Sequence, residues 1–233
     1  MSDYALYYWQ MPFRGQFIRA ILAWAGQRWD EVDDGEIGKT MDADVARQAV
    51  PFKGPPMLVD KRSGFALAQM PAIAYWLGEK HGLLPASVDG KALSLKVVND
   101  ANDVIDELSQ DGGKQMWTPQ RWKAFQPRLA RWMAIWEETG RRHGLMKDSG
   151  FLFGGDEPGI ADVITATLWG TMTDRFKKID TLFKRTAPMT AALTQRVAEL
   201  PPLAALAAKA HEDYGDAYCG GQIEKSLRKV LKA

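Results

Sequence analysis

The sequence contains very little cysteine and histidine, and this excludes several kinds of site. Cys219 is the only cysteine, so no disulfide can form within the chain. The three histidines, His81, His143 and His211, lie far apart in the sequence and have neither neighbouring cysteines nor closely spaced carboxylates. Zinc sites and similar metal sites need such groups close together. We therefore expect neither an internal disulfide nor a bound metal.

The sequence also lacks a strong net charge and a long apolar segment. Thirty basic residues balance twenty-nine acidic ones, so no overall field favours nucleic acid or an anionic membrane surface as a partner. Charged residues or prolines interrupt every apolar run before it reaches the roughly 20 residues that cross a bilayer. The first residues do not resemble a secretory signal. These features predict a soluble, cytoplasmic protein with small-molecule or protein partners.

The first third of the chain carries mixed strand and helix signals. Aromatic residues favour a strand at residues 4–9, followed by a loop at 10–15 and a helix with its apolar face at 17–25. Short strands are predicted at 29–32, 57–60 and 65–67, the last two forming a hairpin. A further helix starts at Pro71, because proline is tolerated in a first helical turn, and ends at Gly82.

The remainder of the chain carries helical signals and almost no strand pattern. Apolar stripes of helical spacing recur at 97–108 and 125–136, and further helices are predicted at 160–176, 188–199 and 203–212. A short basic helix is a candidate at 225–232. The pattern predicts a mixed domain at 1–82, a linker at 83–91 and an all-helical domain at 92–233.

Several short motifs occur in a characteristic order along nearly the whole chain. They are Tyr8-Trp9 ten residues before Ile18-Arg19, then Pro56-Met57-Leu58, Gln69, Val98-Asn99-Asp100 and Gly159-Ile160-Ala161-Asp162. This order resembles the glutathione transferase superfamily, and Tyr8 resembles the catalytic tyrosine of its mu, pi and sigma classes. The resemblance implies a thioredoxin-like domain of β-α-β-α-β-β-α order followed by a helical bundle, in which Asp162 is expected to cap a buried helix. It also implies a homodimer that uses glutathione as co-substrate.

The residue that activates the glutathione thiol is expected to be Tyr8. Other active sites of this superfamily place serine or cysteine after the first strand, but residues 9–19 contain no serine, cysteine or threonine. Tyr7 and Tyr8 point to opposite faces of a strand, so only one can serve, and the resemblance favours Tyr8. The expected reaction is conjugation of glutathione to a hydrophobic electrophile.

The resemblance also implies a set of peptide-binding residues. Arg14 is expected near the tyrosine, although a solvent-facing arginine at a helix start is an alternative. Gln69 is expected to bind the γ-glutamyl end beside a helix N-terminus, where free N–H groups attract a carboxylate. Asp100 matches an acid that reaches across the dimer interface in related proteins, but a solvated polar stripe with Asp103 and Glu107 explains it equally well.

Two departures from the family pattern affect glutathione binding. The residue before the expected cis-proline normally pairs with the cysteinyl part of glutathione through its N–H and C=O. Here Pro55 and Pro56 are both candidates for the cis residue, and Pro55 has no N–H to donate. Met70 stands where the family commonly has serine. We therefore expect weak glutathione binding, and a non-catalytic ligand-binding or protein-binding module, or a glutathione-dependent isomerase or peroxidase, are alternative functions.

Overall fold

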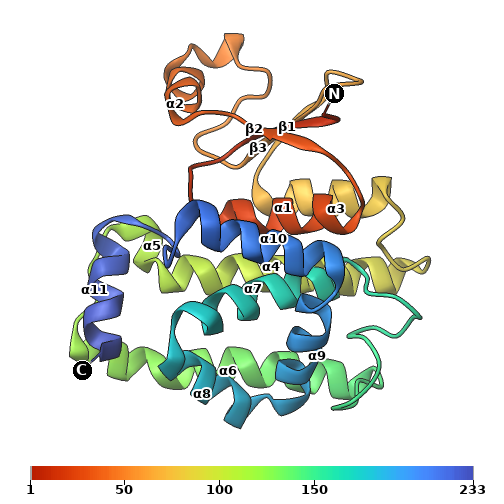
Figure 1. Cartoon of the computed structure of the whole chain (residues 1–233), viewed down its shortest axis with the longest axis vertical. Helices are drawn as coiled ribbons and strands as arrows, with labels where there is room; N and C mark the ends of the chain where they lie inside the picture. Colours follow the sequence, from red (N-terminus) through yellow and green to blue (C-terminus); the bar gives the residue numbers. More distant parts are fainter. Residues whose placement is uncertain (1, 233) are drawn as a thin grey trace.

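A computed structural model describes residues 2–232 of the chain, and its first part combines a small sheet with three helices. The elements of this part, shown in red to yellow in Figure 1, are β1 (Tyr4–Tyr7), α1 (Phe13–Trp24), β2 (Trp29–Glu31), α2 (Asp34–Asp42), the 3-10 turn η1 (Val45–Arg47), β3 (Met57–Asp60), β4 (Ala66–Ala68) and α3 (Met70–Lys80).

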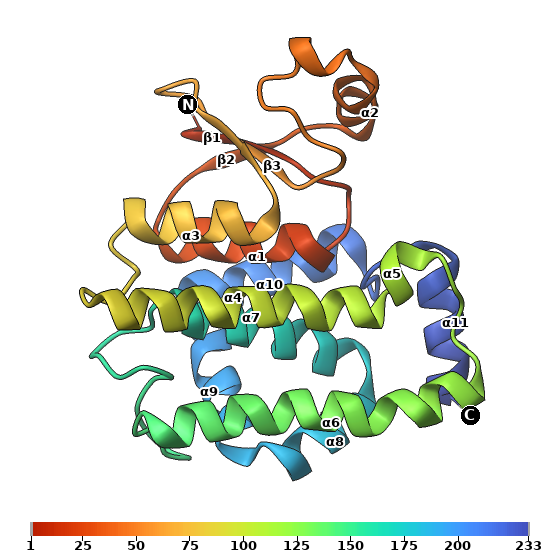
Figure 2. The ribbon, with the colours of Figure 1, turned by 180° about the vertical axis from the view of Figure 1, so that it is seen from behind.

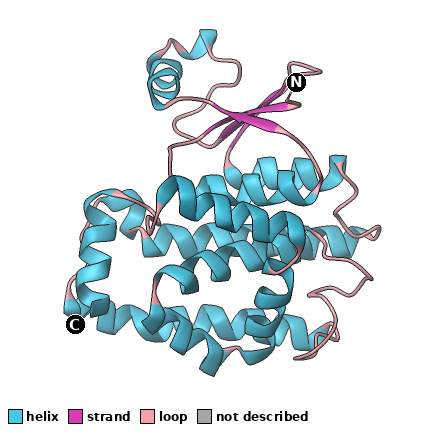
Figure 3. Cartoon of the chain, in the orientation of Figure 1, coloured by secondary structure: helices cyan, strands magenta, loops and turns pink. Residues whose placement is uncertain are grey.

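The four strands lie in the order β2-β1-β3-β4. Figure 3 draws the strands in magenta. Strand β1 pairs in parallel with β2 and antiparallel with β3, and β4 continues the sheet as a hairpin with β3. Tyr4 and Leu6 of β1 are buried in the apolar core, whereas Ala5 and Tyr7 between them are half-buried, as expected for alternating faces of a strand. The observed order of strands and helices confirms the predicted thioredoxin-like first part.

The second part of the chain is helical, as predicted. Its elements are α4 (Val88–Leu108), α5 (Gln110–Gly113), α6 (Pro119–Arg142), α7 (Ile160–Arg175), α8 (Lys177–Thr186), α9 (Pro188–Ala198), α10 (Pro201–Tyr214) and α11 (Gly221–Lys232). Figures 1 and 2 show α1 and α3 between the sheet and this helical part, while α2 lies on the far side of the sheet. The residues around α1 therefore lie where the two parts meet.

Helix α7 is the centre of the helical part. It packs against α1, α4 and α9, and most of its residues are buried on every side, which is typical of a core helix. The Trp169 ring stacks on Phe183 with ring centroids 5.0 Å apart and meets Trp136 edge-on at 5.4 Å. The Trp136 indole N–H donates to Thr165 at 3.0 Å, so its polar atom is satisfied inside the core.

The start of α7 depends on Asp162. Its carboxylate accepts hydrogen bonds from the backbone N–H of Leu152 at 2.7 Å and of Gly159 at 3.0 Å. This confirms the predicted capping role of Asp162 beside Gly159, which has no side chain to cap the helix. Burial raises the pKa of Asp162 to about 6, and the two N–H donors oppose that effect only in part.

Several predicted boundaries were wrong. Helix α1 begins at Phe13, inside the predicted loop, because Pro12 precedes the first turn instead of interrupting it and Gly15 lies within the helix. Strand β1 ends at Tyr7, so Tyr8 lies just beyond it. The helix that the resemblance implies between β2 and β3 is present as α2, and its first turn is capped by the Asp33 carboxylate, which accepts from the Glu36 N–H at 3.1 Å.

Within residues 2–232, no helix combines the length and the apolar composition needed to cross a membrane.

Candidate functional site

The register of the sheet brings three of the predicted site residues to one edge. Tyr7 at the end of β1 pairs with Met57 at the start of β3, so Tyr8 leaves the sheet opposite Pro56. The backbone N–H of Gln69, just after β4, donates to the carbonyl of Pro56 at 3.2 Å. Tyr8, Pro56 and Gln69 therefore lie together at the edge where α1 and α3 begin.

The Tyr8 hydroxyl is buried and fixed by the main chain of α1. Only 4% of the residue is exposed, and its oxygen accepts a hydrogen bond from the backbone N–H of Arg14 at 3.0 Å. Burial raises the pKa of Tyr8 to about 12, and the Arg14 N–H offsets this only in part. The hydroxyl is therefore neutral at physiological pH and keeps its proton, which makes it a hydrogen-bond donor.

Gly15 allows α1 to approach the Tyr8 ring. A Cβ atom at this position would lie 2.2 Å from Cδ1 and 2.6 Å from Cγ of Tyr8, far inside any ordinary contact. The absence of a side chain at Gly15 thus sets how close the helix start comes to the tyrosine. No role for Gly15 follows from the sequence, because nothing in the local pattern shows which ring the helix meets.

Arg19 holds the loop that follows Tyr8. Its guanidinium, almost fully buried, forms two hydrogen bonds with the Glu31 carboxylate at 2.7 and 2.9 Å. It also donates to the carbonyls of Met11 at 2.8 Å and Trp9 at 3.4 Å. The guanidinium carbon lies 5.8 Å from the centroid of the Tyr8 ring. Arg19, which the sequence analysis used only as a family marker, is therefore a positioning residue for this loop.

The side chain of Arg14 points to the helical part of the molecule. Its Nη2 atom lies 3.1 Å from Oδ1 of Asp106 on α4, and its guanidinium lies 5.1 Å from the centroid of the Phe13 ring. The side chain is mostly buried, so it is not the freely solvated arginine that was the alternative interpretation. Its backbone contacts Tyr8, while its charge is paired with α4.

Gln69 and Met70 begin α3 in different ways. Gln69 precedes the helix with φ of 76°, a backbone conformation that residues other than glycine rarely adopt, and its side chain is exposed and makes no capping hydrogen bond. Met70, only 1% exposed, packs into the apolar core. The Gln69 side chain is thus available at the site edge, whereas Met70 can offer only its backbone N–H there.

The structure shows which of the two adjacent prolines, Pro55 or Pro56, is in the cis form. The Pro55-Pro56 peptide bond is cis, so Pro56 is the cis residue. Pro55 precedes it and, as a proline, has no N–H. At this position the chain can present the Pro55 carbonyl to a ligand but no matching donor.

Asp100 lies apart from these residues, on α4. Its carboxylate pairs with Lys96 one turn earlier on the same helix. Asp103 and Glu107 continue the acidic face, and burial together with the nearby Asp100 and Glu107 charges raises the pKa of Asp103. No hydrogen bond or ion pair among residues 2–232 joins Asp100 to the Tyr8 edge. The structure therefore brings Tyr8, Arg14, Pro55, Pro56 and Gln69 together, but not Asp100.

Comparison with known proteins identifies the family. The model of the glutathione S-transferase C-terminal domain matches residues 93–230, which is more than half of the chain.

This chain belongs to the glutathione S-transferase family.

Solved structures of the family share the fold over nearly their full length. NaGST-2 is 25% identical, with a TM-score of 0.70, and the alignment covers 89% of this chain and 97% of that one. Monomeric Na-GST-3 from the hookworm Necator americanus is 23% identical, with a TM-score of 0.71 and the same coverage. A Nu-class transferase from Haemonchus contortus is 20% identical, with a TM-score of 0.69, covering 90% and 98%. No curated protein sequence matches this chain.

In this glutathione S-transferase family member, the segment after α10 packs on the loop beside Tyr8. The Tyr218 carbonyl accepts from the Phe13 N–H at 3.2 Å, and the two rings meet edge-on with centroids 5.5 Å apart. The Glu224 carboxylate fixes the segment by accepting from the N–H groups of Tyr218, Cys219 and Gly220 at 2.6 to 2.9 Å. This contact, absent from the sequence analysis, joins residues about two hundred positions apart.

Cys219 in the same segment has the properties of an unreactive thiol. Burial and the neighbouring Glu224 charge raise the pKa of Cys219 to about 12. The thiol therefore stays protonated at neutral pH and is a poor nucleophile. Within residues 2–232, no three His, Cys, Asp or Glu side chains are grouped closely enough to hold a metal ion.

Proposed function

We propose that this chain is a tyrosine-type glutathione transferase, similar to the mu, pi and sigma classes, that conjugates glutathione to a hydrophobic electrophile. The observation that carries the proposal is the state of Tyr8. Its hydroxyl is neutral, is oriented by the Arg14 N–H, and has a proton to donate at the edge where Gln69 and Pro56 meet. A sulfur atom placed there would receive a hydrogen bond.

This hydrogen bond accounts for the activation of a thiol. A free cysteine thiol has a pKa near 8.5, so it is mostly protonated at neutral pH. Lowering that pKa by about two units requires roughly 2.7 kcal/mol of preference for the thiolate. A hydrogen bond to a charged acceptor contributes about 1.5–3 kcal/mol, and the N-terminus of α1 adds a favourable dipole. The thiol proton leaves to solvent, and the thiolate forms a bond to the electrophilic carbon as the leaving group departs.

The peptide part of glutathione would lie along the same edge. We propose that the exposed Gln69 side chain and the free N–H groups at the start of α3 bind the γ-glutamyl end, where Met70 contributes its backbone N–H. The Pro55 carbonyl would accept from the cysteinyl N–H of the ligand. Pro55 has no N–H to donate and Met70 has no hydroxyl, so the site lacks two of the hydrogen bonds to glutathione that the family pattern provides. We therefore expect a glutathione dissociation constant well above the low micromolar range.

The roles of Arg14 and Asp100 are narrower proposals. The Arg14 guanidinium, tied to Asp106, would add positive potential near the thiolate. Asp100 would approach glutathione only from the partner subunit of a homodimer. We also propose that glutathione binds to a first domain at 1–82, joined by a linker at 83–91 to the helical domain at 92–233, which supplies the electrophile pocket.

The test compares wild type with Tyr8→Phe, using glutathione and 1-chloro-2,4-dinitrobenzene. Removing only the hydroxyl should lower kcat/KM by about tenfold to a hundredfold and shift the pH dependence of the reaction upward by about one to two pH units. Tyr7→Phe is the matched control, because Tyr7 is the neighbouring tyrosine at the end of β1 and is only half-buried, and it should change neither quantity. Equal activity of Tyr8→Phe and wild type rules out the catalytic assignment.

A second candidate is a non-catalytic module that binds apolar ligands or another protein. The observations that favour it are the missing N–H of Pro55, the core position of Met70 and the near-complete burial of Tyr8. Calorimetric titration with glutathione up to millimolar concentration separates the two candidates. If the wild type neither binds nor conjugates glutathione, the result supports the non-catalytic module. If it binds glutathione and acts on hydroperoxides or isomerisable substrates but not on aryl halides, the result points to a peroxidase or isomerase.

A further inference from the structure

Basic residues gather on three helices, although the chain as a whole is nearly neutral. Helices α6, α8 and α11 together contain fourteen basic and four acidic residues, which is a formal net charge of +10. The whole chain carries +1, so the remaining residues carry −9. The balanced composition gave no reason to expect an anionic partner, but the fold separates charges that cancel only in the total.

Eight cations of these helices are exposed and form no ion pair with any of residues 2–232. They lie on α6, on α8 and in the last turn of α11, and we call them the basic face: Arg121, Lys123, Arg131, Lys177, Lys178, Arg185, Lys229 and Lys232. A positive charge that no neighbouring carboxylate neutralises is free to attract an anion from solution.

The three helices meet at the end of the molecule away from the sheet. Figures 1 and 2 view the chain from opposite sides, and both show α6 and α8 side by side at this end, where α11 also ends. Helix α6 has 24 residues and is therefore about 36 Å long. Strand β1, which leads to Tyr8, lies with the sheet at the opposite end. The basic face is therefore distant from the sheet.

The four acidic residues of the same helices do not offset the basic face. Glu137 and Glu224 accept hydrogen bonds from main-chain N–H groups of α9 and of the segment before α11. Glu138 lies between two arginines of α6, at 2.7 and 2.8 Å, and Asp180 pairs with a lysine of α8 at 3.0 Å. Each of these carboxylates already has its own partners.

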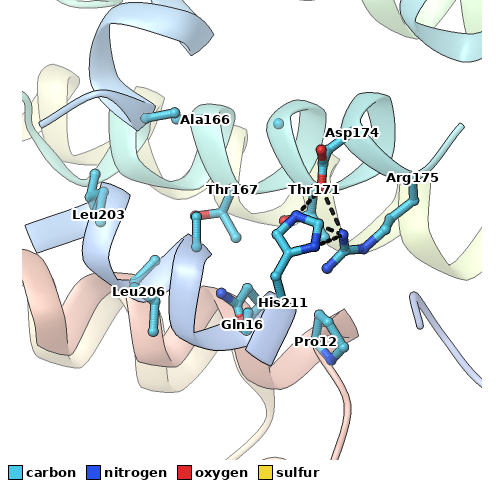
Figure 4. A pocket seen from close by; sticks show the side chains of 15 residues that line it. Pro12, Gln16, Ala166, Thr167, Thr171, Asp174, Arg175, Leu203, Leu206 and His211 are labelled. Atoms are coloured by element: carbon cyan, nitrogen blue, oxygen red, sulfur yellow. Dashed lines mark hydrogen bonds and ion pairs between the residues drawn. The ribbon is translucent and has the colours of Figure 1, made fainter. Parts of the chain in front are cut away.

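Arg175, at the end of α7, differs from the cations of the basic face although it lies next to α8 in the sequence. Its side chain is only 3% exposed, and its Nη1 atom lies 2.9 Å from Oδ2 of Asp174. Its Nε atom donates to the carbonyl of Ala217 at 3.3 Å. Figure 4 shows this pair of side chains together with His211. Arg175 is therefore neutralised inside the fold and does not belong to the basic face.

The chemistry of the basic face favours an anionic lipid surface over nucleic acid. The large apolar side chains that are exposed among residues 2–232 all lie outside α6, α8 and α11, so the face offers none to stack on unpaired bases. Helix α6 lies along this end of the molecule, whereas a helix that reads duplex DNA enters the major groove. Two long helices side by side instead match a planar array of headgroups, and clusters of about four to eight Lys and Arg are typical of binding sites for acidic phospholipids.

We propose that the basic face docks the protein peripherally on the surface of a bilayer that contains anionic phospholipids. The lysine and arginine side chains contact the phosphate and carboxylate groups of the lipids, and the contact stays at the level of the headgroups. The negative remainder of the molecule is repelled by the same surface, which orients the sheet away from the membrane. The inference does not depend on the proposed transferase function.

The test measures co-sedimentation of the full chain with vesicles. One set contains about 30% phosphatidylserine in phosphatidylcholine and the other contains phosphatidylcholine alone, each at about 0.1 M and about 0.5 M KCl. The basic-face variant combines Arg131→Gln, Lys178→Gln and Arg185→Gln. The matched control combines Lys39→Gln, Arg47→Gln and Arg62→Gln, which removes the same charge from exposed cations in the first part of the chain.

Wild type should sediment with the anionic vesicles at the lower salt, be released at the higher salt, and not sediment with phosphatidylcholine alone. One cation near an anionic membrane contributes about fivefold to the partition coefficient, so the basic-face variant should bind about a hundredfold more weakly. The control variant should bind within about threefold of wild type, because salt screens charges at the far end of the molecule.

Three results would overturn the proposal. The first is wild type that stays in the supernatant with anionic vesicles at about 0.1 M KCl, and the second is an equal loss of binding in the two triple variants. The third is tighter binding to a duplex DNA than to the vesicles at the same salt, which would assign the basic face to nucleic acid. Tyr8→Phe should bind vesicles as wild type does, so failure of the transferase assignment leaves this measurement unaffected.

Discussion

Replacing Gly15 by alanine tests whether the close approach of α1 sets the position of the Tyr8 hydroxyl. The added Cβ atom would lie 2.2 Å from Cδ1 of the Tyr8 ring, about 1.2 Å inside the 3.4 Å at which ordinary contacts begin. The nearest atoms belong to a buried aromatic ring and not to the end of a flexible chain, so the ring or the helix start must move by about that distance.

A movement of this size affects both activity and stability. A displacement of about 1 Å in a catalytic group lowers rates by roughly a hundredfold, so kcat/KM for glutathione conjugation should fall by about that factor in Gly15→Ala. Overpacking in a core costs about 1–3 kcal/mol of unfolding free energy. The loss of activity should be close to that of Tyr8→Phe, because both changes remove the same hydrogen bond to sulfur.

The assay combines conjugation kinetics with urea unfolding, and it includes a matched glycine. A Cβ atom added at Gly38 in α2 would meet no atom of residues 2–232 within 4 Å, so Gly38→Ala should leave activity unchanged and stability equal or slightly higher. In the background of Tyr8→Leu, the stability cost of Gly15→Ala should shrink, because the ring that the new carbon meets is gone.

Two results would refute the reasoning. One is a folded Gly15→Ala protein whose kcat/KM lies within about twofold of wild type. The other is an equal stability cost of Gly15→Ala with and without the Tyr8 ring, since that outcome would assign the cost to the helix backbone instead of to the contact with the tyrosine.

Three further changes test the groups that support the site. In Asp162→Asn, the free energy of unfolding should depend less on pH than in wild type. The pKa of Asp162 in the folded protein, about 6, lies above its ordinary value, so the wild type should lose about 3 kcal/mol of unfolding free energy as the pH rises from about 4 through 6. Urea unfolding at several pH values measures this, and the same pH dependence in both proteins would contradict it. Arg19→Lys keeps the charge but loses the paired hydrogen bonds to Glu31. We expect the unfolding free energy to fall by about 2–4 kcal/mol and kcat/KM to fall with it, whereas an unchanged melting curve argues against the positioning role of Arg19. Glu224→Gln should cost about 1.5–3 kcal/mol by weakening three charge-assisted hydrogen bonds, and thermal unfolding measures it.

The order of strands and helices was predictable because it depends on local apolar periodicity. The aromatic strand-forming residues of β1 and the helical stripes of α4 and α6 are visible in the sequence, and the structure confirms these elements. The capping role of Asp162 was also predictable, since its partners lie within ten residues. The start of α1 was not, because Pro12 and Gly15 favour a loop locally, and the close approach of Gly15 to the Tyr8 ring is visible only in the folded chain.

The candidate site was predictable only in part, because several of its contacts join distant segments. The Arg14 side chain finds its partner Asp106 ninety-two positions away on another helix. The contact of Tyr218 with Phe13 spans nearly the whole chain. No local pattern indicates such pairs. Tyr8 itself could be named from the sequence, because the resemblance to the family favours it over Tyr7 and residues 9–19 contain no serine, cysteine or threonine, and its catalytic role stays a prediction.

The hydrogen bond from the main chain of residue 14 to Tyr8 has a consequence for how the site can change during evolution. Every amino acid except proline supplies the same backbone N–H, so the orientation of the hydroxyl is inherited with the helix and not with the side chain. Substitution at position 14 can therefore alter the link to Asp106 on α4 without redirecting the tyrosine. In the proposed transferase, the shape of the proposed electrophile pocket and the activation of the thiol would then diverge independently at a single residue.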